Sequence, residues 1–328
     1  MQRRTIVGTE VAVSTVGFGG APIGGLYRPT DDETAADAVA AAWEAGVRYF
    51  DTAPHYGLGL SERRLGRALA GYPRDEYVVS SKVGRLLVPN PRPTGSDLEA
   101  GGFDVPDDLV RVRDYSADGV RRCIEESLER LGLDYLDIVL VHDAEDHMDA
   151  ALGEGVPALA ELRAQGLVRA VGVGMNFVEP LRRFAQLPEV DVLMAAGRWT
   201  AVDRGGAPLL AECLERGVSV LAAAPFNSGL LSTAWPKDGA HFNYESVPAP
   251  VLAAARRIAA VCQDYGVELP ALAMQFGLRH PAVASVVVGM RTAEHSRTNV
   301  RWATAPIPDE IWPAVDAAVQ EPAEAQGS

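Results

Sequence analysis

The feature that most constrains this chain is an alternation of short apolar runs with alanine-rich segments of helical pattern, from about residue 15 to about residue 305. Most of the apolar runs do not alternate with polar residues, as is typical of parallel strands covered by helices. The predicted strands are Thr15–Phe18, Val47–Asp51, Tyr77–Lys82, Leu136–Val141, Val168–Val173, Val190–Met194, Ser219–Ala222 and Ser285–Val288. The predicted helices cover residues 32–45, 61–70, 117–131, 155–165, 179–186, 207–216, 251–265 and 292–303.

Eight strand and helix pairs in this order favour a closed (β/α)8 barrel of the TIM type over an open, doubly wound sheet. An open sheet that binds a dinucleotide usually carries a GxGxxG fingerprint. The nearest segment, Gly17–Pro22, has proline where that fingerprint needs its last glycine. Its glycines therefore serve either a tight turn at the barrel mouth or a close approach of the backbone to a ligand.

We interpret residues 1–328 as one domain, because barrels of this type form single units of about 250 residues or more. A hairpin over residues 5–13 precedes the barrel at about 15–305, and a helix at Asp309–Val319 lies in the tail 306–328. Two long segments, 83–115 and 224–250, follow the third and seventh strands. Both emerge at the carboxyl end of the barrel, where active sites of this fold lie, and we expect binding loops there.

Charge and composition exclude several functional classes. The chain has 30 Lys and Arg against 44 Asp and Glu, a net charge of −14, which argues against a nucleic-acid surface. No apolar run approaches the roughly 20 residues of a membrane helix, so we expect a cytoplasmic protein without a membrane partner. The three cysteines, Cys123, Cys213 and Cys262, are far apart and predict neither disulfides nor a zinc cluster. The acidic segment His142–His147 matches no zinc spacing, and no metal is expected.

Four reactive side chains lie at or just after the ends of neighbouring strands: Asp51, Tyr56, Lys82 and His142. A tyrosine with an ordinary pKa near 10 is a poor base unless a nearby cation favours its phenolate, and Lys82 can supply that cation. Asp51 can keep a buried Lys82 charged. His142 can orient a carbonyl or alcohol oxygen. Together these four residues predict a site that transfers a proton to or from an oxygen atom while a second group is transferred at the carbon.

Five blocks resemble the aldo-keto reductases, in the order in which that family has them. They are Asp51–Gly57, Ser81–Gly84, Leu140–His142, Gly172–Phe177, and Val288–Arg291 with His295 and Asn299. The resemblance implies a (β/α)8 barrel and hydride transfer between nicotinamide and a carbonyl or alcohol carbon. It implies that Tyr56 is the proton donor or acceptor, tuned by Lys82 and Asp51, and that Asn176 orients the nicotinamide. The implied cofactor-binding residues are Gly19, Gly20, Asp51, Met175, Asn176, Pro225, Phe226, Asn227, Gly229, Leu231, Gly289, Arg291, His295 and Asn299.

Within that family the chain looks most like the branch of aldose and pyridoxal dehydrogenases. The resemblance implies oxidation of a sugar such as L-fucose or a D-threo-aldose to its lactone, or of pyridoxal, or reduction of an aldehyde. His55, Asp143 and Trp199 are candidate substrate contacts, although His55 is also a candidate for a local structural role. Trp199, Trp235 and Tyr244 either stack on a sugar or pack within loops. The tyrosine that many members stack on nicotinamide is absent near Ala223, and the nearest aromatic, Phe226, either replaces it or forms a wall of the substrate site.

The form of the cofactor depends on the residues at its adenosine end. Arg291, His295, Arg297 and Arg301 favour the 2′-phosphate of NADP, while Glu294 suits the free ribose of NAD, so NADP is slightly favoured and NAD stays open. We expect a monomer or small homo-oligomer. A different class remains as an alternative, because the family includes regulatory subunits that hold nucleotide with little turnover.

Overall fold

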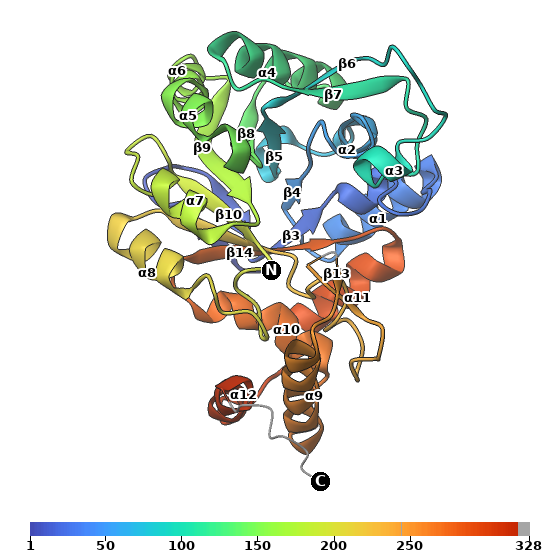
Figure 1. Ribbon diagram of the computed structural model, residues 1–328, viewed down its shortest axis with the longest axis vertical. Coiled ribbons are helices and arrows are strands. Elements are labelled where there is room, and N and C mark those ends of the chain that lie inside the picture. The colour runs from blue at the N-terminus through green and yellow to red at the C-terminus, as the bar shows by residue number, and fades with distance from the viewer. Residues whose placement is uncertain (244, 321–328) are drawn as a thin grey trace.

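A closed barrel of eight parallel strands forms the centre of the computed structural model, which describes residues 1–243 and 245–320 (Figure 1). In spatial order the strands are β3 (Val16–Gly19), β4 (Tyr49–Asp51), β5 (Val78–Val83), β8 (Leu136–His142), β9 (Val168–Met175), β10 (Val192–Ala196), β11 (Ser219–Ala223) and β14 (Val283–Gly289). The last strand, β14, pairs in parallel with β3 and closes the barrel. The predicted (β/α)8 barrel is confirmed, and each predicted strand overlaps one barrel strand.

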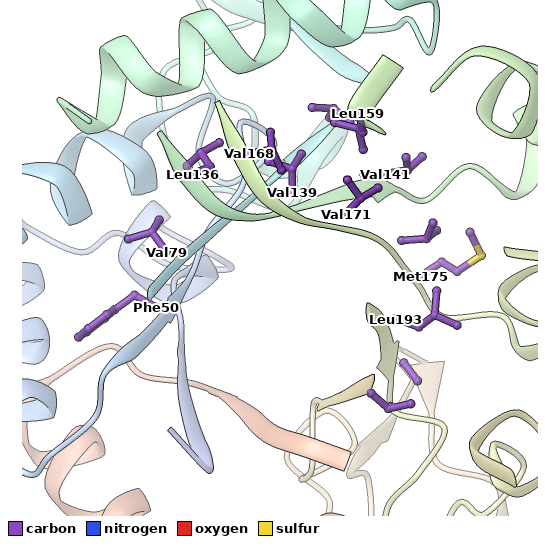
Figure 2. Packing of buried hydrophobic residues seen from close by; sticks show 14 of the residues in the cluster. Phe50, Val79, Leu136, Val139, Val141, Leu159, Val168, Val171, Met175 and Leu193 are labelled. Atoms are coloured by element: carbon purple, nitrogen blue, oxygen red, sulfur yellow. The ribbon is translucent and has the colours of Figure 1, made fainter. Parts of the chain in front are cut away.

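Alternate side chains of each strand divide the apolar core into two layers. Along β8, Val139 and Val141 belong to the outer layer with Leu159 of α6 (Val156–Ala164), as Figure 2 shows. Ile138 and Leu140, which alternate with these two residues along the strand, belong to the layer inside the barrel. The uninterrupted apolar runs in the sequence thus reflect burial of both faces of the strands.

A hairpin at the amino terminus of the chain packs against the inner layer of the barrel core. Its strands are β1 (Arg3–Thr5) and β2 (Ala12–Ser14), and Ile6, Val11 and Val13 are buried in the inner cluster. The predicted hairpin is present, and because Thr5 pairs with Ala12 the connection between its strands runs from Ile6 to Val11. Ile6 and Val11 remain joined within that connection by a 2.8 Å backbone hydrogen bond.

Helices surround the barrel. They are α1 (Asp32–Glu44), α2 (Leu60–Leu69), α4 (Ala117–Leu131), α6, α7 (Val178–Phe184), α8 (Ala207–Arg216), α10 (Leu269–Phe276) and α11 (Ala293–Thr304), with the short α5 (Met148–Ala150) before α6. None of the helices in the described residues has the length and apolarity needed to cross a bilayer.

The seventh barrel helix differs from the prediction. The predicted helix 251–265 is α9 (Ala249–Asp264), which packs on α12 (Ile311–Gln320) beyond the barrel (Figure 1). The helix that follows β11 in the barrel layer is α10, which the sequence pattern missed. Seven of its residues are buried, between the barrel on one side and α9 and α12 on the other. A helix that is apolar on all sides lacks the 3.6-residue period on which such predictions depend.

The two long segments at the carboxyl end of the barrel contain more structure than expected. Segment 83–115 holds an antiparallel pair, β6 (Arg85–Pro89) and β7 (Leu109–Arg113), with α3 (Leu98–Gly101) between them. We call this segment the lid. Segment 224–250 holds β12 (His241–Phe242) and β13 (Glu245–Ser246). Tyr244 and the tail residues 321–328 lie outside the described residues.

Candidate active site

The alternation of side chains along the strands places three of the four predicted reactive residues inside the barrel mouth. Asp51 lies two residues after the inner residue Tyr49, and His142 lies two residues after the inner residue Leu140. Lys82 has the equivalent place on β5, four residues after the inner residue Val78. All three are buried.

Tyr56 reaches the same place from the turn after β4. The three residues after it, Gly57, Leu58 and Gly59, all have left-handed backbone, with φ of 62°, 52° and 80°. A Cβ atom at Gly57 would lie only 2.1 Å from the carbonyl oxygen of Gly24, so this position requires glycine. The turn brings the Tyr56 ring over Lys82, with Nζ 4.7 Å from the ring centroid.

Lys82 and Asp51 form a buried ion pair beneath Tyr56. The Lys82 ammonium donates to both carboxylate oxygens of Asp51, at 2.9 and 2.8 Å, and to the carbonyl oxygen of Thr52 at 2.9 Å. The hydroxyl of Ser80 also donates to Asp51 Oδ1, at 2.7 Å. Burial alone would lower the pKa of Lys82, but Asp51 and Tyr56 oppose it and raise that pKa to about 12. Lys82 therefore stays charged at neutral pH.

Burial dominates the pKa of Tyr56 itself. It raises this pKa above the ordinary 10.0, although the charge of Lys82 and a hydrogen bond with it act in the opposite direction. Lys82 therefore favours the phenolate of Tyr56, as expected, but its effect on the pKa is smaller than that of burial. In the free protein Tyr56 is a neutral phenol, which suits a proton donor, and Lys82 limits the cost of ionising it.

His142 completes the group as an uncharged ring. Burial, followed by the charges of Arg85 and Lys82, lowers its pKa well below 6.5, so the imidazole is neutral. Its ring stands edge-on to Tyr56 with centroids 6.0 Å apart. The hydroxyl of Tyr115, at the end of the lid, donates to the His142 carbonyl oxygen at 2.7 Å and fixes the backbone there. A neutral imidazole in this position can orient an oxygen atom without taking its proton.

The raised pKa of Tyr56 predicts opposite pH profiles for the two directions of an alcohol–carbonyl reaction. Oxidation needs the phenolate as proton acceptor, so its kcat/KM should rise with pH from about 6 to about 10. Reduction needs the neutral phenol, so its kcat/KM should stay level over that range. Steady-state kinetics in both directions measure this, and a level oxidation profile would contradict the assignment.

All four residues line one cavity of about 450 Å³ at the carboxyl end of the barrel. Two predicted substrate residues, His55 and Asp143, line it as well. Phe103 of the lid forms part of its wall, with its ring centroid 6.0 Å from that of Tyr56 and 5.2 Å from that of His55. The structure thus brings together residues from three strands, one turn and the lid around a space sized for a small molecule.

A second cavity, of about 970 Å³, joins the first. The residues that line both are Leu26, Tyr27, Asn176, Ala196 and Ala224. Of the predicted cofactor residues, Gly19, Gly20, Asp51, Met175, Asn176 and Gly289 line the first cavity, and Asn176 and Asn227 line the second. The two cavities therefore adjoin at Asn176, with the reactive group in the first.

The glycines at the barrel mouth are explained by the protein's own packing. A Cβ atom at Gly20 would lie 2.7 Å from the carbonyl oxygen of Asp51 and 2.8 Å from the hydroxyl of Ser61. One at Gly19 would lie 3.0 Å from the carbonyl oxygen of Val288. Close packing against neighbouring strands and Ser61 therefore accounts for both glycines, while their backbone still lines the cavity.

The segment after β11 has an unusual backbone beside the second cavity. Ala224, Asn227 and Ser228 all have left-handed backbone, with φ of 56°, 44° and 56°. Asn227 donates from Nδ2 to the carbonyl oxygen of Gly197 at 3.2 Å, while its buried Oδ1 has no hydrogen-bond partner in the part of the chain that the structure describes. Strained backbone and an unpaired polar atom in one loop are typical of a ligand site.

Several predicted contacts lie elsewhere. Phe226 packs edge-on against Trp302, with ring centroids 6.0 Å apart, and lines neither cavity. Leu231 is buried in the cluster under α9. Met175 lines the first cavity, but its side chain packs in the outer layer near Leu193 (Figure 2), because strand alternation turns it away from the barrel interior. Pro225 and Gly229 belong to the turn and line neither cavity.

Of the two alternatives for Trp199, its contacts favour packing, and it lines neither cavity. Its indole nitrogen donates to the carbonyl oxygen of Gly277 at 3.2 Å, and its ring packs on Phe276 at 5.1 Å. Trp199 therefore joins β10 to the seventh barrel helix. Among the described residues no group of three or more His, Cys, Asp or Glu side chains is arranged to hold a metal ion.

Cationic side chains gather at the end of β14, where an adenosine end was predicted. Arg291 donates to the carbonyl oxygens of Leu26 and Arg28, at 2.6 and 2.9 Å, and to the hydroxyl of Thr30 at 2.6 Å. His295 Nδ1 accepts from the backbone nitrogen of Arg291 at 3.4 Å. Burial and the charge of Arg28 lower the pKa of both Arg291 and His295, which places Arg28 beside them.

Sequence reasoning missed Arg28, because it lies 263 positions from Arg291 along the chain. The other two predicted cations are engaged with acidic residues: Arg297 lies 3.8 Å from Glu44, and Arg301 lies 3.5 Å from Glu268. Asn299 is buried on α11 and lines neither cavity. The positive charge available at this end therefore comes from Arg28 and Arg291, because the lowered pKa of His295 leaves its ring neutral at pH 7.

Comparison with known proteins agrees with this site. Residues 15–320 match the model of the aldo/keto reductase family. The chain belongs to the aldo/keto reductase family. It is 44% identical to a D-threo-aldose 1-dehydrogenase from a Pseudomonas species over 92% of this chain and 93% of that one. It is 37% identical to a pyridoxal 4-dehydrogenase from Microbacterium luteolum over 95% of each.

A solved aldo-keto reductase of Bacillus halodurans, in its holo form, has the same fold, with a TM-score of 0.76 over 99% of each chain at 22% identity. The protein is an NAD(P)-dependent oxidoreductase, as this family membership and the aldose dehydrogenase relative support. Members of the family bind a nicotinamide dinucleotide and a small-molecule substrate.

Proposed function

We propose that this protein oxidises the C1 hydroxyl of an aldose, in its cyclic hemiacetal form, to the corresponding lactone. The observation that carries the proposal is the buried group in which Tyr56 lies over the Lys82–Asp51 pair and beside the neutral ring of His142, in one small cavity. The 44% identity to a D-threo-aldose 1-dehydrogenase supports the choice of sugar.

The roles of the residues follow from their positions. A nicotinamide cofactor bound beside Asn176 would supply the acceptor for the hydride released when the C1–H bond breaks. The Tyr56 oxygen accepts the proton from the C1 hydroxyl, so that the carbonyl of the lactone forms. Lys82, held charged by Asp51, stabilises the Tyr56 phenolate that takes this proton. His142 donates a hydrogen bond to the same substrate oxygen and directs it toward Tyr56.

The residues along the joined cavities fit a dinucleotide. The amide of Asn176 borders both cavities, where it can hold a carboxamide. The unpaired Oδ1 of Asn227 offers an acceptor further along. Arg28 and Arg291 offer positive charge at the far end, beside the neutral ring of His295, in a protein whose net charge is −14. This local concentration of cations suits an anionic ligand.

We propose NADP as the preferred cofactor, with Arg28 as a 2′-phosphate partner. Arg28→Ala should weaken NADP binding roughly 10- to 100-fold, the range for one charge-assisted hydrogen bond, and leave NAD binding within about twofold. Arg291→Ala should weaken both cofactors, because Arg291 also anchors the loop of Leu26. Arg297→Ala is the matched control, since Arg297 lies beside Glu44. Equal losses of NADP and NAD in Arg28→Ala, measured by fluorescence titration, would contradict the assignment.

The substrate is tested by a panel with product analysis. The protein is mixed with NAD or NADP and with aldoses, pyridoxal or simple aldehydes, and the products are identified by nuclear magnetic resonance. The proposal predicts a sugar lactone as the product of the best substrate. The identity of 37% to a pyridoxal 4-dehydrogenase makes pyridoxal the second candidate, and a preference for it would replace the sugar assignment.

A further inference from the structure

Two polar side chains beside the reactive group take no part in the proton transfer described above. His55 and Asp143 both line the first cavity, and both lie next to His142. The ring centroid of His55 is 5.7 Å from that of His142. Asp143 Oδ2 is 3.5 Å from His142 Nε2. Any oxygen that His142 orients therefore has these two side chains as neighbours.

Asp143 is held in an unfavourable backbone conformation. Its φ of 45° is left-handed, which costs a non-glycine residue free energy unless its surroundings fix it. Its backbone nitrogen donates to the carbonyl oxygen of Gly174 at 3.0 Å, and its own carbonyl oxygen accepts from the Tyr115 hydroxyl at 3.0 Å. β9 and the end of the lid thus hold the backbone that presents this carboxylate to the cavity.

Among the described residues, only one oxygen of the Asp143 carboxylate has a polar contact. Oδ2 accepts from Arg85 of the lid, and Oδ2 is also the oxygen that faces His142. No hydrogen bond among the described residues involves Oδ1. Burial raises the pKa of Asp143, while the charges of Arg85 and Arg113 oppose that rise. The carboxylate therefore keeps an acceptor for a ligand.

His55 is fixed as an uncharged donor. Its carbonyl oxygen accepts from Arg111 at 2.8 Å, and its ring packs edge-on against Phe103 at 5.2 Å. Nδ1 is buried with no partner, so the single ring proton is better placed on Nε2. Burial, with the charges of Arg85 and Arg111, lowers the pKa of His55 to about 2. The ring thus stays neutral across the working pH range and can donate one hydrogen bond from Nε2.

We propose that His55 and Asp143 together bind the hydroxyl on the carbon next to the reacting carbon. His55 Nε2 donates to that hydroxyl oxygen, and the hydroxyl donates to Asp143 Oδ1. This inference rests on the proposed function, and it narrows the substrate class to compounds with a hydroxyl at C2, beside the oxidised C1. A substrate without that hydroxyl leaves both side chains unpaired, and polar sites of this kind discriminate strongly against such analogues.

The test compares an aldose with its 2-deoxy analogue in four proteins. Wild type should prefer the aldose by about 100-fold or more in kcat/KM. His55→Leu removes the donor, and Asp143→Asn removes the carboxylate while asparagine tolerates the left-handed backbone. Each variant should lose most of its rate with the aldose and change less than about threefold with the 2-deoxy sugar. The double variant should be little worse than either single one, because both side chains act on one hydroxyl.

Controls separate this result from damage to the fold or to the chemistry. Asp146→Asn, an exposed aspartate three residues further along, should behave as wild type. Dinucleotide affinity and the thermal midpoint of each variant report its folding. Equal losses with both sugars in His55→Leu and Asp143→Asn, or equal rates of wild type with both sugars, would overturn the inference. Failure of the proposed function looks different: wild type would turn over neither sugar and would act on a simple aldehyde or pyridoxal instead.

Discussion

Replacing Tyr56 with phenylalanine is expected to lower kcat by about 10²- to 10⁴-fold, the usual worth of a positioned proton-transfer group. The change removes one hydroxyl from a ring that packs between Phe103 and His142, at 6.0 Å from each. Dinucleotide affinity and stability should therefore stay close to wild type. Steady-state kinetics measure the rate, and fluorescence titration measures the affinity.

The matched control is Tyr72→Phe. Tyr72 stacks on Trp43 at 4.0 Å, and its side chain lines neither of the two cavities. This variant should keep the wild-type rate. If Tyr56→Phe kept that rate as well, proton transfer would have to come from another group, and the roles given to Lys82 and Asp51 would fall with it.

Replacing Asp51 with alanine is expected to destabilise the protein by about 3–5 kcal/mol at neutral pH, because it leaves the buried Lys82 ammonium without its counter-charge. Both side chains are nearly inaccessible, at 2% exposed for Lys82 and 4% for Asp51. The hydroxyl of Ser80 also loses its acceptor. Urea unfolding measures the loss, and circular dichroism confirms that the variant is folded at the start.

The pH dependence of this loss identifies its cause. In wild type the pKa of Lys82 is raised to about 12, so its contribution to stability is present below the unfolded value near 10.4 and disappears as pH rises through about 12. Without Asp51, burial lowers that pKa below the unfolded value, so the variant gains stability as Lys82 loses its proton. The difference between variant and wild type should therefore shrink from pH 7 to about pH 10. A constant difference would point to lost packing instead.

A double variant, Asp51→Leu with Lys82→Met, separates stability from catalysis. Replacing both members of a buried pair with apolar side chains is often neutral for stability. We expect the double variant to recover most of the unfolding free energy and none of the turnover. Recovery of activity would show that the pair serves the fold and not the chemistry.

The sequence was sufficient for the barrel and for its reactive group because both depend on local periodicity. A period of two along β4, β5 and β8 fixes which residues face inward, and thus places Asp51, Lys82 and His142 together. The seventh barrel helix, α10, was missed because burial on all sides erases its period. The predicted helix at 251–265 is real, but it packs on α12.

The sequence was insufficient where a side chain's partner is distant along the chain. Trp199 looks like a sugar-stacking residue until its indole is seen bonded to Gly277. Arg28 has no local signal at all, and only its position beside Arg291 and His295 gives it a role. The raised pKa of Tyr56 also depends on residues that are distant along the chain, because burial by the lid and the barrel outweighs the effect of the neighbouring Lys82.

The most direct test of this account follows nicotinamide absorbance when the protein is mixed with oxidised dinucleotide and an aldose. The account predicts that reduced nicotinamide accumulates with wild type and not with Tyr56→Phe, while both proteins bind the dinucleotide with equal affinity. Tight dinucleotide binding by wild type without any absorbance change, for every hydroxyl or carbonyl compound tried, would contradict it and would identify a nucleotide-binding regulatory subunit.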